Sequence, residues 1–227
     1  MIFGGMQKSS TIDFPGLISC VLFTRGCNLD CFYCHNRELL GSGDTVDESE
    51  IISFLRKREG LLDGVVISGG EPTLQPDLKD FLKKIRSLNY KIKLDTNGQL
   101  PEIVRDICME GLTDYIAVDV KAKKEDYKRI CGFSGFERVS DTLSILFELG
   151  VKFEARTTLY PSLELTELKE LFSSLPVMPI WRLNYFKMPL LIKDGDAPLL
   201  NRDSLTSLKI TQARQELRSI QPNLVFD

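Results

Sequence analysis

Three absences narrow the class of protein to which this sequence can belong. It has no excess of basic residues: 29 Lys and Arg stand against 32 Asp and Glu, and the net charge of −3 excludes the basic face of a dedicated nucleic-acid binder. No apolar run reaches the roughly 18–20 residues that span a bilayer, and the first residues lack the basic and apolar regions of a signal peptide. We therefore expect a cytoplasmic protein with no membrane and no nucleic acid among its partners.

Internal repeats, low-complexity tracts and obvious linkers are also missing from the sequence. Its 227 residues, 43% of them apolar and 27% charged, are ordinary for a globular protein that buries a full core. We expect one domain over residues 1–227.

What recurs along the chain is a short apolar strand followed by a longer amphipathic helix. The six expected strands cover residues 17–23, 65–68, 90–94, 115–118, 151–159 and 180–185. A tail at residues 223–226 is expected to pair as an edge strand. Three local signals predict helix ends: the capping-box pair Thr45 and Glu48, Pro101 at a helix start and Gly150 at a helix end.

Six strand–helix units in succession predict a parallel sheet with helices outside it. A complete eight-unit barrel typically needs about 250 residues, more than this chain offers. We therefore predict an α/β fold with a single domain, an open and partial (β/α)6 TIM-like barrel. A flat, doubly wound sheet is the alternative.

The cytoplasm keeps thiols reduced, so the six cysteines are not expected to form disulfides and must have another role. Cys20, Cys108 and Cys131 are scattered singly, and we expect them to be small buried hydrophobic residues without a ligand role. The other three, Cys27, Cys31 and Cys34, lie within eight residues in one loop. Clustered thiolates select zinc or an iron–sulfur cluster.

The choice between zinc and iron depends on the fourth ligand. His35 could complete a Cys₃His zinc site, but adjacent residues such as Cys34 and His35 rarely point the same way. Three cysteines with no fourth instead suit a cubane cluster with one iron open to another ligand. We predict a [4Fe–4S] cluster on Cys27, Cys31 and Cys34, with a zinc site as the alternative.

Polar residues follow the expected strands at the point where each strand ends. In parallel α/β folds, ligands bind at the carboxyl ends of the strands. The polar positions are Gly69, Gly70 and Glu71, then Asp95, Thr96 and Asn97, then Asp119 and Lys121, with Arg156 in the fifth strand and Asn184 and Tyr185 closing the sixth. Together with the cysteine loop, they predict a site at one edge of the sheet.

These motifs resemble those of a known family. The spacing Cys-x-x-x-Cys-x-aromatic-Cys, with Tyr33 as the aromatic residue, is similar to the signature of the radical S-adenosylmethionine (SAM) superfamily, and Gly69-Gly70-Glu71 resembles its GGE motif. Other segments resemble the glycyl-radical-enzyme activases, most of all the anaerobic ribonucleoside-triphosphate reductase activating proteins. These are residues 8–16, 34–36, 94–98, 118–121 and 156–158. The resemblance covers about residues 8–190 and leaves a carboxyl-terminal helix and tail at 200–227.

The resemblance implies an oxidoreductase that binds a [4Fe–4S] cluster and SAM. The reduced cluster would pass one electron into SAM, giving methionine and a 5′-deoxyadenosyl radical that removes a hydrogen atom from the substrate. In the group that this sequence resembles most, the substrate is a glycine of a glycyl-radical enzyme, the anaerobic ribonucleotide reductase. A flavodoxin or ferredoxin type of protein would supply the electron.

The resemblance also implies roles for individual residues. Glu71 would accept a hydrogen bond from the SAM ammonium group, and Gly69 and Gly70 would let the backbone approach closely. Lys121 suits the SAM carboxylate. Arg156 contacts SAM or pairs with Glu154 or a neighbouring carboxylate.

The segment from Asp95 to Asn97 is implied to contribute to the same cofactor site. Asp95, Thr96 and Asp119 would hold the ribose hydroxyls or a monovalent cation beside SAM, and Asn97 is either a cofactor contact or a plain turn residue. The activases' histidine near the sixth strand has no counterpart here. Asn184 or Tyr185 is expected in its place.

Two other functions remain open at this point. One is radical chemistry on a small molecule, as in compact relatives such as the 7-carboxy-7-deazaguanine synthases. The other is a zinc-stabilised binding module without catalysis. The absence of a second cysteine cluster and of a surplus domain favours an open site that faces a protein.

Overall fold

Among residues 1–226, which the computed structural model describes, every strand belongs to one sheet in the sequential order β1 to β8. β1 (Phe3–Ser10) runs antiparallel to β2 (Ser19–Thr24), and all other neighbours are parallel. The remaining strands are β3 (Gly64–Gly69), β4 (Lys91–Thr96), β5 (Tyr115–Asp119), β6 (Phe153–Leu159), β7 (Trp181–Tyr185) and β8 (Leu224–Phe226).

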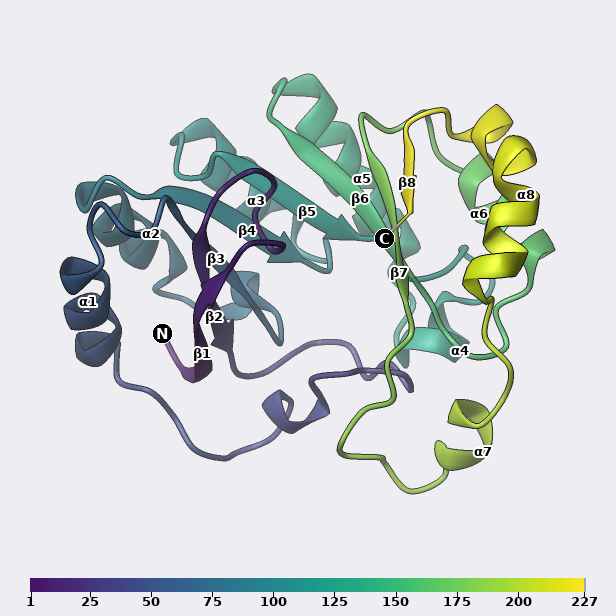
Figure 1. Cartoon of the computed structure of the whole chain (residues 1–227), viewed down its shortest axis with the longest axis horizontal. Coiled ribbons are helices and arrows are strands. Elements are labelled where there is room, and N and C mark those ends of the chain that lie inside the picture. Colours follow the sequence, from purple (N-terminus) through teal and green to yellow (C-terminus); the bar gives the residue numbers. More distant parts are fainter. Residues whose placement is uncertain (227) are drawn as a thin grey trace.

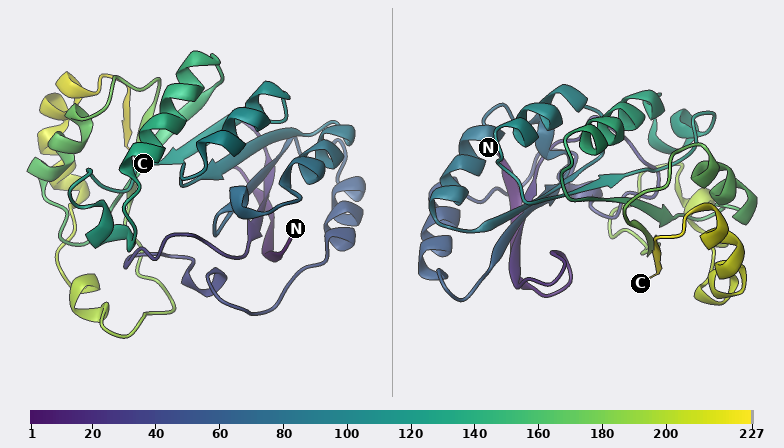
Figure 2. Two further views of the ribbon diagram at one scale, coloured as in Figure 1. Left: turned by 180° about the vertical axis from the view of Figure 1, so that it is seen from behind. Right: turned by 90° about the horizontal axis from the view of Figure 1, so that it is seen from above.

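The sheet is curved, and the longer helices lie along its outer side (Figures 1 and 2). The helices are α1 (Glu48–Lys57), α2 (Leu78–Ser87), α3 (Pro101–Met109), α4 (Tyr127–Cys131), α5 (Phe136–Glu148), α6 (Leu165–Ser173), α7 (Ala197–Leu200) and α8 (Ser207–Ile220). A doubly wound sheet reverses its strand order at a switch point, whereas this order never reverses. The predicted open, partial barrel is confirmed, and the doubly wound alternative is wrong.

The six predicted strands correspond to β2 through β7. The tail also pairs as predicted, with Leu224 opposite Trp181 in a parallel register. The antiparallel strand β1 was not predicted, because its sequence FGGMQKSS has two glycines and little apolar alternation. It forms because the edge of β2 offers it a backbone partner.

Two of the three predicted helix ends are confirmed. Pro101 is the first residue of α3, and Gly150 follows α5 with a φ of 62°. The capping box at Thr45 is wrong, because α1 begins at Glu48 after Asp47 as the N-cap residue. The preceding residue Val46 is held in an extended bridge, its N–H donating to the Phe3 carbonyl at 2.9 Å, so the chain cannot enter a helix there.

The apolar residues form two separate cores. The larger one lies between the sheet and its helices. The smaller one lies inside the barrel and consists of Phe14, Val21, Val66 and Tyr115, with the Phe14 and Tyr115 rings 6.3 Å apart. Tyr115 begins β5 and Phe14 also packs against Gly64, which begins β3, so this cluster closes the amino end of the barrel. The opposite end of the barrel, at the carboxyl ends of the strands, is lined by the polar loops. No helix among the described residues has both the length and the apolar character of a membrane span.

Candidate active site

The cysteine loop follows β2 and is anchored from two sides. Cys31 is buried, while Cys27 and Cys34 are half-buried. The Asp30 N–H donates to the Cys131 carbonyl at 2.9 Å, so the end of α4 lies beside the loop. Cys131 was expected to be a lone cysteine, but its thiol is a close enough neighbour of the Cys31 thiol to raise the pKa of Cys31.

Arg37 holds the loop from its other side. Its buried guanidinium donates to the Asp30 carboxylate and to the Cys31 carbonyl, both at 2.7 Å, and it pairs with Asp196 at 3.3 Å. Lys193 forms a second ion pair with Asp30. The loop between β7 and α7 is therefore fastened to the cysteine loop at two points.

The three thiols share one positive neighbour. Burial is the main cause that raises the pKa of Cys27, to about 11, and that of Cys34. For Cys31 the contact with the Cys131 thiol raises the pKa first and burial second. The Lys121 ammonium lowers the pKa of all three thiols, which favours the thiolate form that binds metal.

The donor set fits a cluster better than a single zinc ion. His35, the candidate fourth zinc ligand, is exposed. In residues 1–226 no three His, Cys, Asp or Glu side chains gather in a way that could hold one metal ion. A structural zinc site needs four ligands around one point, whereas a [4Fe–4S] cluster takes thiolates at separate corners. Three neighbouring thiols beside Lys121 suit the second arrangement.

Gly69 and Gly70 bring the end of β3 against the start of the cysteine loop. Gly69 has a φ of 112°, which favours glycine, and a Cβ on Gly70 would lie 2.0 Å from the Gly26 carbonyl oxygen. The Gly70 N–H donates to the Thr24 carbonyl at 2.9 Å, and the Glu71 N–H to the Gly26 carbonyl at 2.8 Å. The close approach is thus made to the residues that lead into Cys27.

Gly70→Ala is expected to lower both the stability and the iron content. The new methyl group must push the Gly26 backbone away, and overpacking of this kind costs about 1–3 kcal/mol. Thermal unfolding and iron analysis after anaerobic reconstitution would measure both effects. The matched control is Gly5→Ala, whose methyl group meets no atom within 4 Å. Equal unfolding temperatures for the two variants would contradict the proposed packing.

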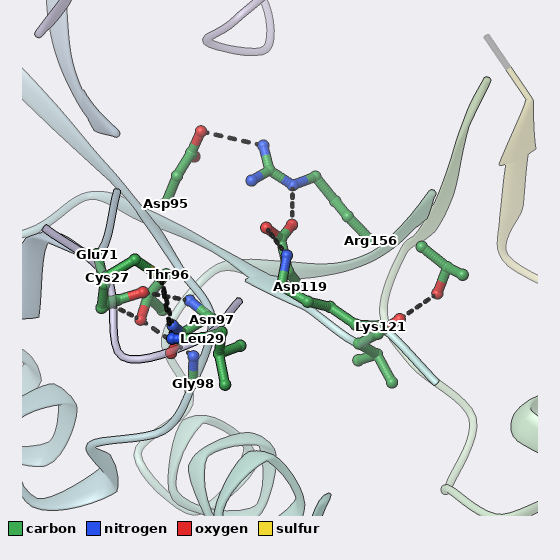
Figure 3. Close-up of polar contacts among 12 residues, drawn as sticks. Cys27, Leu29, Glu71, Asp95, Thr96, Asn97, Gly98, Asp119, Lys121 and Arg156 are labelled. Atoms are coloured by element: carbon green, nitrogen blue, oxygen red, sulfur yellow. Dashed lines mark hydrogen bonds and ion pairs between the residues drawn. The ribbon is translucent and has the colours of Figure 1, made fainter. Parts of the chain in front are cut away.

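Glu71 is fully buried, and other residues of the chain donate hydrogen bonds to both of its carboxylate oxygens (Figure 3). Oε1 accepts from the Thr73 N–H at 3.0 Å, the Thr73 hydroxyl at 2.6 Å and the Thr96 hydroxyl at 2.7 Å. Oε2 accepts from the Asn97 N–H at 2.6 Å. Burial raises the pKa of Glu71, and these hydrogen bonds oppose the shift. Glu71 was expected to face the SAM ammonium group, but here it joins the end of β3 to the end of β4.

Charged side chains form a chain across the inner face of the sheet (Figure 3). Arg156 on β6 pairs with Asp95 on β4 and with Asp119 on β5, each at 3.0 Å. Lys93 pairs with the other oxygen of Asp95 at 2.8 Å, and Lys121 pairs with Asp119 at 3.2 Å. Three cations thus surround two carboxylates, so the chain of charges carries a net positive charge beside the thiols.

The cations decide the protonation state of both carboxylates. Burial alone would raise the pKa of Asp119, but Arg156 and Lys121 outweigh it and lower the pKa to about 2. Asp95 follows the same pattern, with Arg156 and Lys93 lowering its pKa against burial. Both are carboxylates at neutral pH and can accept hydrogen bonds from a ligand.

The sequence reasoning missed part of this inner face. Lys93, Glu154 and Arg182 lie on it, and Arg182 donates to Glu154 at 3.1 Å. Each stands two residues before a polar residue that was predicted: Asp95, Arg156 or Asn184. Buried parallel strands are usually apolar on both faces, so polar residues at every second position indicate a polar inner face. That period of two was the signal available in the sequence.

Of the two residues expected in place of the activases' histidine, Asn184 is the better placed. It stands in register with Thr158 and two residues after Arg182, on the inner side of β7. Tyr185 packs against the large outer core instead. Asn184, like Arg182, thus lies on the face of this strand that lines the site.

A comparison with known families identifies the fold and its chemistry. The family model for the radical SAM superfamily matches residues 21–175, which span the cysteine loop and strands β3 through β6. The chain belongs to the radical SAM superfamily. Members of this family bind a [4Fe–4S] cluster and SAM, and this chain is a radical SAM enzyme with three loop cysteines suited to that cluster.

Individual proteins agree with the assignment. Two proteins of Methanocaldococcus jannaschii that are named as glycyl-radical enzyme activating enzymes are 37% and 31% identical to this chain. The first match covers 70% of this chain and 69% of the relative, and the second covers 81% and 71%.

Solved structures share the fold of this radical SAM enzyme. TYW1 with a bound lysine-pyruvate adduct has a TM-score of 0.61 at 20% identity, covering 90% of this chain and 73% of its own. The protein anSMEcpe with bound AdoMet has a TM-score of 0.63 at 18% identity, and the match covers 86% of this chain and 57% of anSMEcpe. SuiB of Streptococcus suis bound to S-adenosylmethionine has a TM-score of 0.63 at 17% identity, and the match covers 91% of this chain and 51% of SuiB.

Proposed function

We propose that this radical SAM enzyme is a glycyl-radical-enzyme activase and that its protein substrate is an anaerobic ribonucleotide reductase. The names of the two Methanocaldococcus relatives support the activase assignment. The resemblance of residues 8–13 and 156–158 to the reductase activating proteins supports the choice of partner. A flavodoxin or ferredoxin type of protein is the proposed electron donor.

The observation that carries the proposal is an exposed apolar rim beside the site. The loop after β7 presents Met188, Leu190, Leu191 and Ile192 to solvent, and Leu190 is 94% exposed. Exposed apolar side chains that cluster in this way are typical of protein-binding surfaces. Because Lys193 and Asp196 fasten this loop to the cysteine loop, a bound protein would lie next to the cluster.

The residues of the chain divide the work of binding the cofactors. Cys27, Cys31 and Cys34 would hold three irons of the cluster, leaving the fourth for the amino and carboxylate groups of SAM. When bound, the cluster and SAM supply a 5′-deoxyadenosyl radical that takes a hydrogen atom from the substrate. Lys121 would neutralise the SAM carboxylate.

The carboxylates at the ends of β4 and β5 would complete the SAM site. Asp95 and Asp119 can accept hydrogen bonds from the ribose hydroxyls, with Thr96 beside them. A monovalent cation next to SAM would have to compete with Arg156, which already pairs with both carboxylates.

Glycine is a suitable target for this open site. Both flanking amides stabilise a radical at its Cα, and the missing Cβ leaves that carbon accessible. A partner loop that carries such a glycine could reach the cluster past the apolar rim, whereas a small molecule would need no rim of this kind.

The proposal predicts that SAM cleavage depends on the partner. Reconstituted enzyme with SAM and dithionite should cleave SAM slowly alone and faster when the anaerobic ribonucleotide reductase is added. Electron paramagnetic resonance should then detect an organic radical on the partner, split into a doublet by the remaining α-hydrogen. Consumption of a nucleobase or pterin precursor, with no radical on any glycyl-radical protein, would replace the proposal with small-molecule chemistry.

A further inference from the structure

Asn97 connects the end of β4 directly to the first cysteine of the loop. The side chain is 4% exposed, and its Nδ2 donates to the Cys27 Sγ at 3.7 Å and to the Asn28 Oδ1 at 2.8 Å (Figure 3 shows the contact with Cys27). The Cys27 sulfur also accepts from the Leu29 N–H at 3.4 Å. Two N–H donors therefore converge on one sulfur that belongs to the predicted cluster ligands.

The orientation of the Asn97 amide is fixed by its other contacts. Its Oδ1 accepts from the Gln99 N–H at 3.0 Å, so this atom must be the oxygen and the opposite atom, which faces Cys27, must be the nitrogen. Its backbone N–H donates to Glu71, which also receives the Thr96 hydroxyl. Asn97 thus has little freedom to turn its amide away from the sulfur.

We propose that Asn97 is a positioning residue for the cluster, held in place by Glu71, and that it donates a hydrogen bond to the Cys27 thiolate. Hydrogen bonds to ligand sulfurs help to set the reduction potential of iron–sulfur clusters. A donor on the sulfur stabilises the reduced cluster, which carries one more negative charge. Asn97 therefore raises the midpoint potential and eases the electron transfer on which SAM cleavage depends.

The role differs from the SAM contact or plain turn expected from the sequence. A plain turn residue would need only its backbone bond to Glu71 and its bond from Gln99. The Asn97 side-chain nitrogen instead donates both to the Asn28 Oδ1 and to the Cys27 sulfur, so it connects the turn to the first ligand of the cysteine loop. The inference uses the cluster alone and is independent of the partner protein.

Two variants and one matched control test the inference. Asn97→Asp keeps the acceptor for Gln99, removes the donor to Cys27 and Asn28 and adds a negative charge, whereas Asn97→Leu has a similar shape and removes the same donor without adding a charge. Thr142→Val is the control, because the Thr142 hydroxyl donates to the Gly98 carbonyl at 2.8 Å and so supports the same turn without touching the cysteine loop.

The readout is the midpoint potential of the reconstituted cluster, measured by redox titration with electron paramagnetic resonance, without SAM and without partner. Both Asn97 variants should shift it to more negative values, while Thr142→Val should leave it unchanged. An unchanged potential in an Asn97 variant that holds four irons would overturn the inference. The activase proposal would survive that result, since it rests on radical transfer to the partner.

A second measurement covers variants that fail to load iron. In the cluster-free protein, the alkylation of Cys27 is compared with that of Cys34 by mass spectrometry of the same sample. The thiolate is the form that reacts, so loss of the Asn97 donor should make Cys27 react more slowly relative to Cys34 in both Asn97 variants, but not in Thr142→Val. A ratio of Cys27 to Cys34 alkylation that equals the wild-type ratio in both Asn97 variants would also overturn the inference.

Discussion

Replacing any one of Cys27, Cys31 and Cys34 with alanine is expected to abolish both the cluster and the reductive cleavage of SAM. In the proposed site these three thiolates are the full protein contribution to the cluster, so two would be too few to hold it. The absorption of the reconstituted protein, its iron and sulfide content and the yield of 5′-deoxyadenosine measure the loss. A protein purified anaerobically with stoichiometric zinc and no iron would refute the cluster assignment.

Cys108→Ala provides the matched control. Cys108 is half-buried in α3, and burial raises the pKa of its thiol to about 11 with no metal-site neighbour among the causes. This variant should keep four irons and full SAM turnover. Cys131→Ser was expected to behave in the same way, and it stays a prediction. Because the Cys131 thiol raises the pKa of the neighbouring Cys31 thiol, this variant also tests whether Cys131 supports that proposed ligand.

The strand order and the position of the site could be predicted because they depend on local patterns. Apolar runs marked the strands, and the residues after them, from the cysteine loop to Asp119, fell at the carboxyl edge. Chain direction in a parallel sheet then brings these residues together, whatever their separation in sequence. The side of the sheet on which a ligand would bind followed without any knowledge of contacts.

The partners within the site could not be predicted, because they depend on register and rotamer. Arg156 reaches across β5 to Asp95 on β4, and nothing in the sequence distinguishes that pairing from one with its neighbour Glu154. The carboxylate of Glu71 could face either a ligand or the protein, and only the packing against Thr73 and Thr96 decides this. Cys131 is isolated in the sequence, but it ends α4, which the fold places beside the cysteine loop.

Arg156→Met is expected to destabilise the fold more than any surface substitution, because it removes the cation shared by two buried carboxylates. Breaking a buried ion pair costs about 3–5 kcal/mol, and we expect about 3 kcal/mol here, since the Asp119 side chain keeps 30% of its surface exposed. Urea unfolding followed by circular dichroism measures the loss. The control is Lys84→Met, whose ion pair with Glu48 is exposed and worth about 0–1 kcal/mol.

The pH dependence distinguishes a lost ion pair from lost packing. The pKa of Asp119 is lowered from 3.8 to about 2 in the folded protein, so its contribution is fully present above the unfolded pKa and disappears as the pH falls through the folded pKa. The stability difference between wild type and Arg156→Met should therefore be largest near pH 7 and shrink between about pH 4 and pH 2. A difference that stays constant down to pH 3 would attribute the effect to packing of the arginine stem. The two carboxylates would then owe their charge to Lys93 and Lys121 alone.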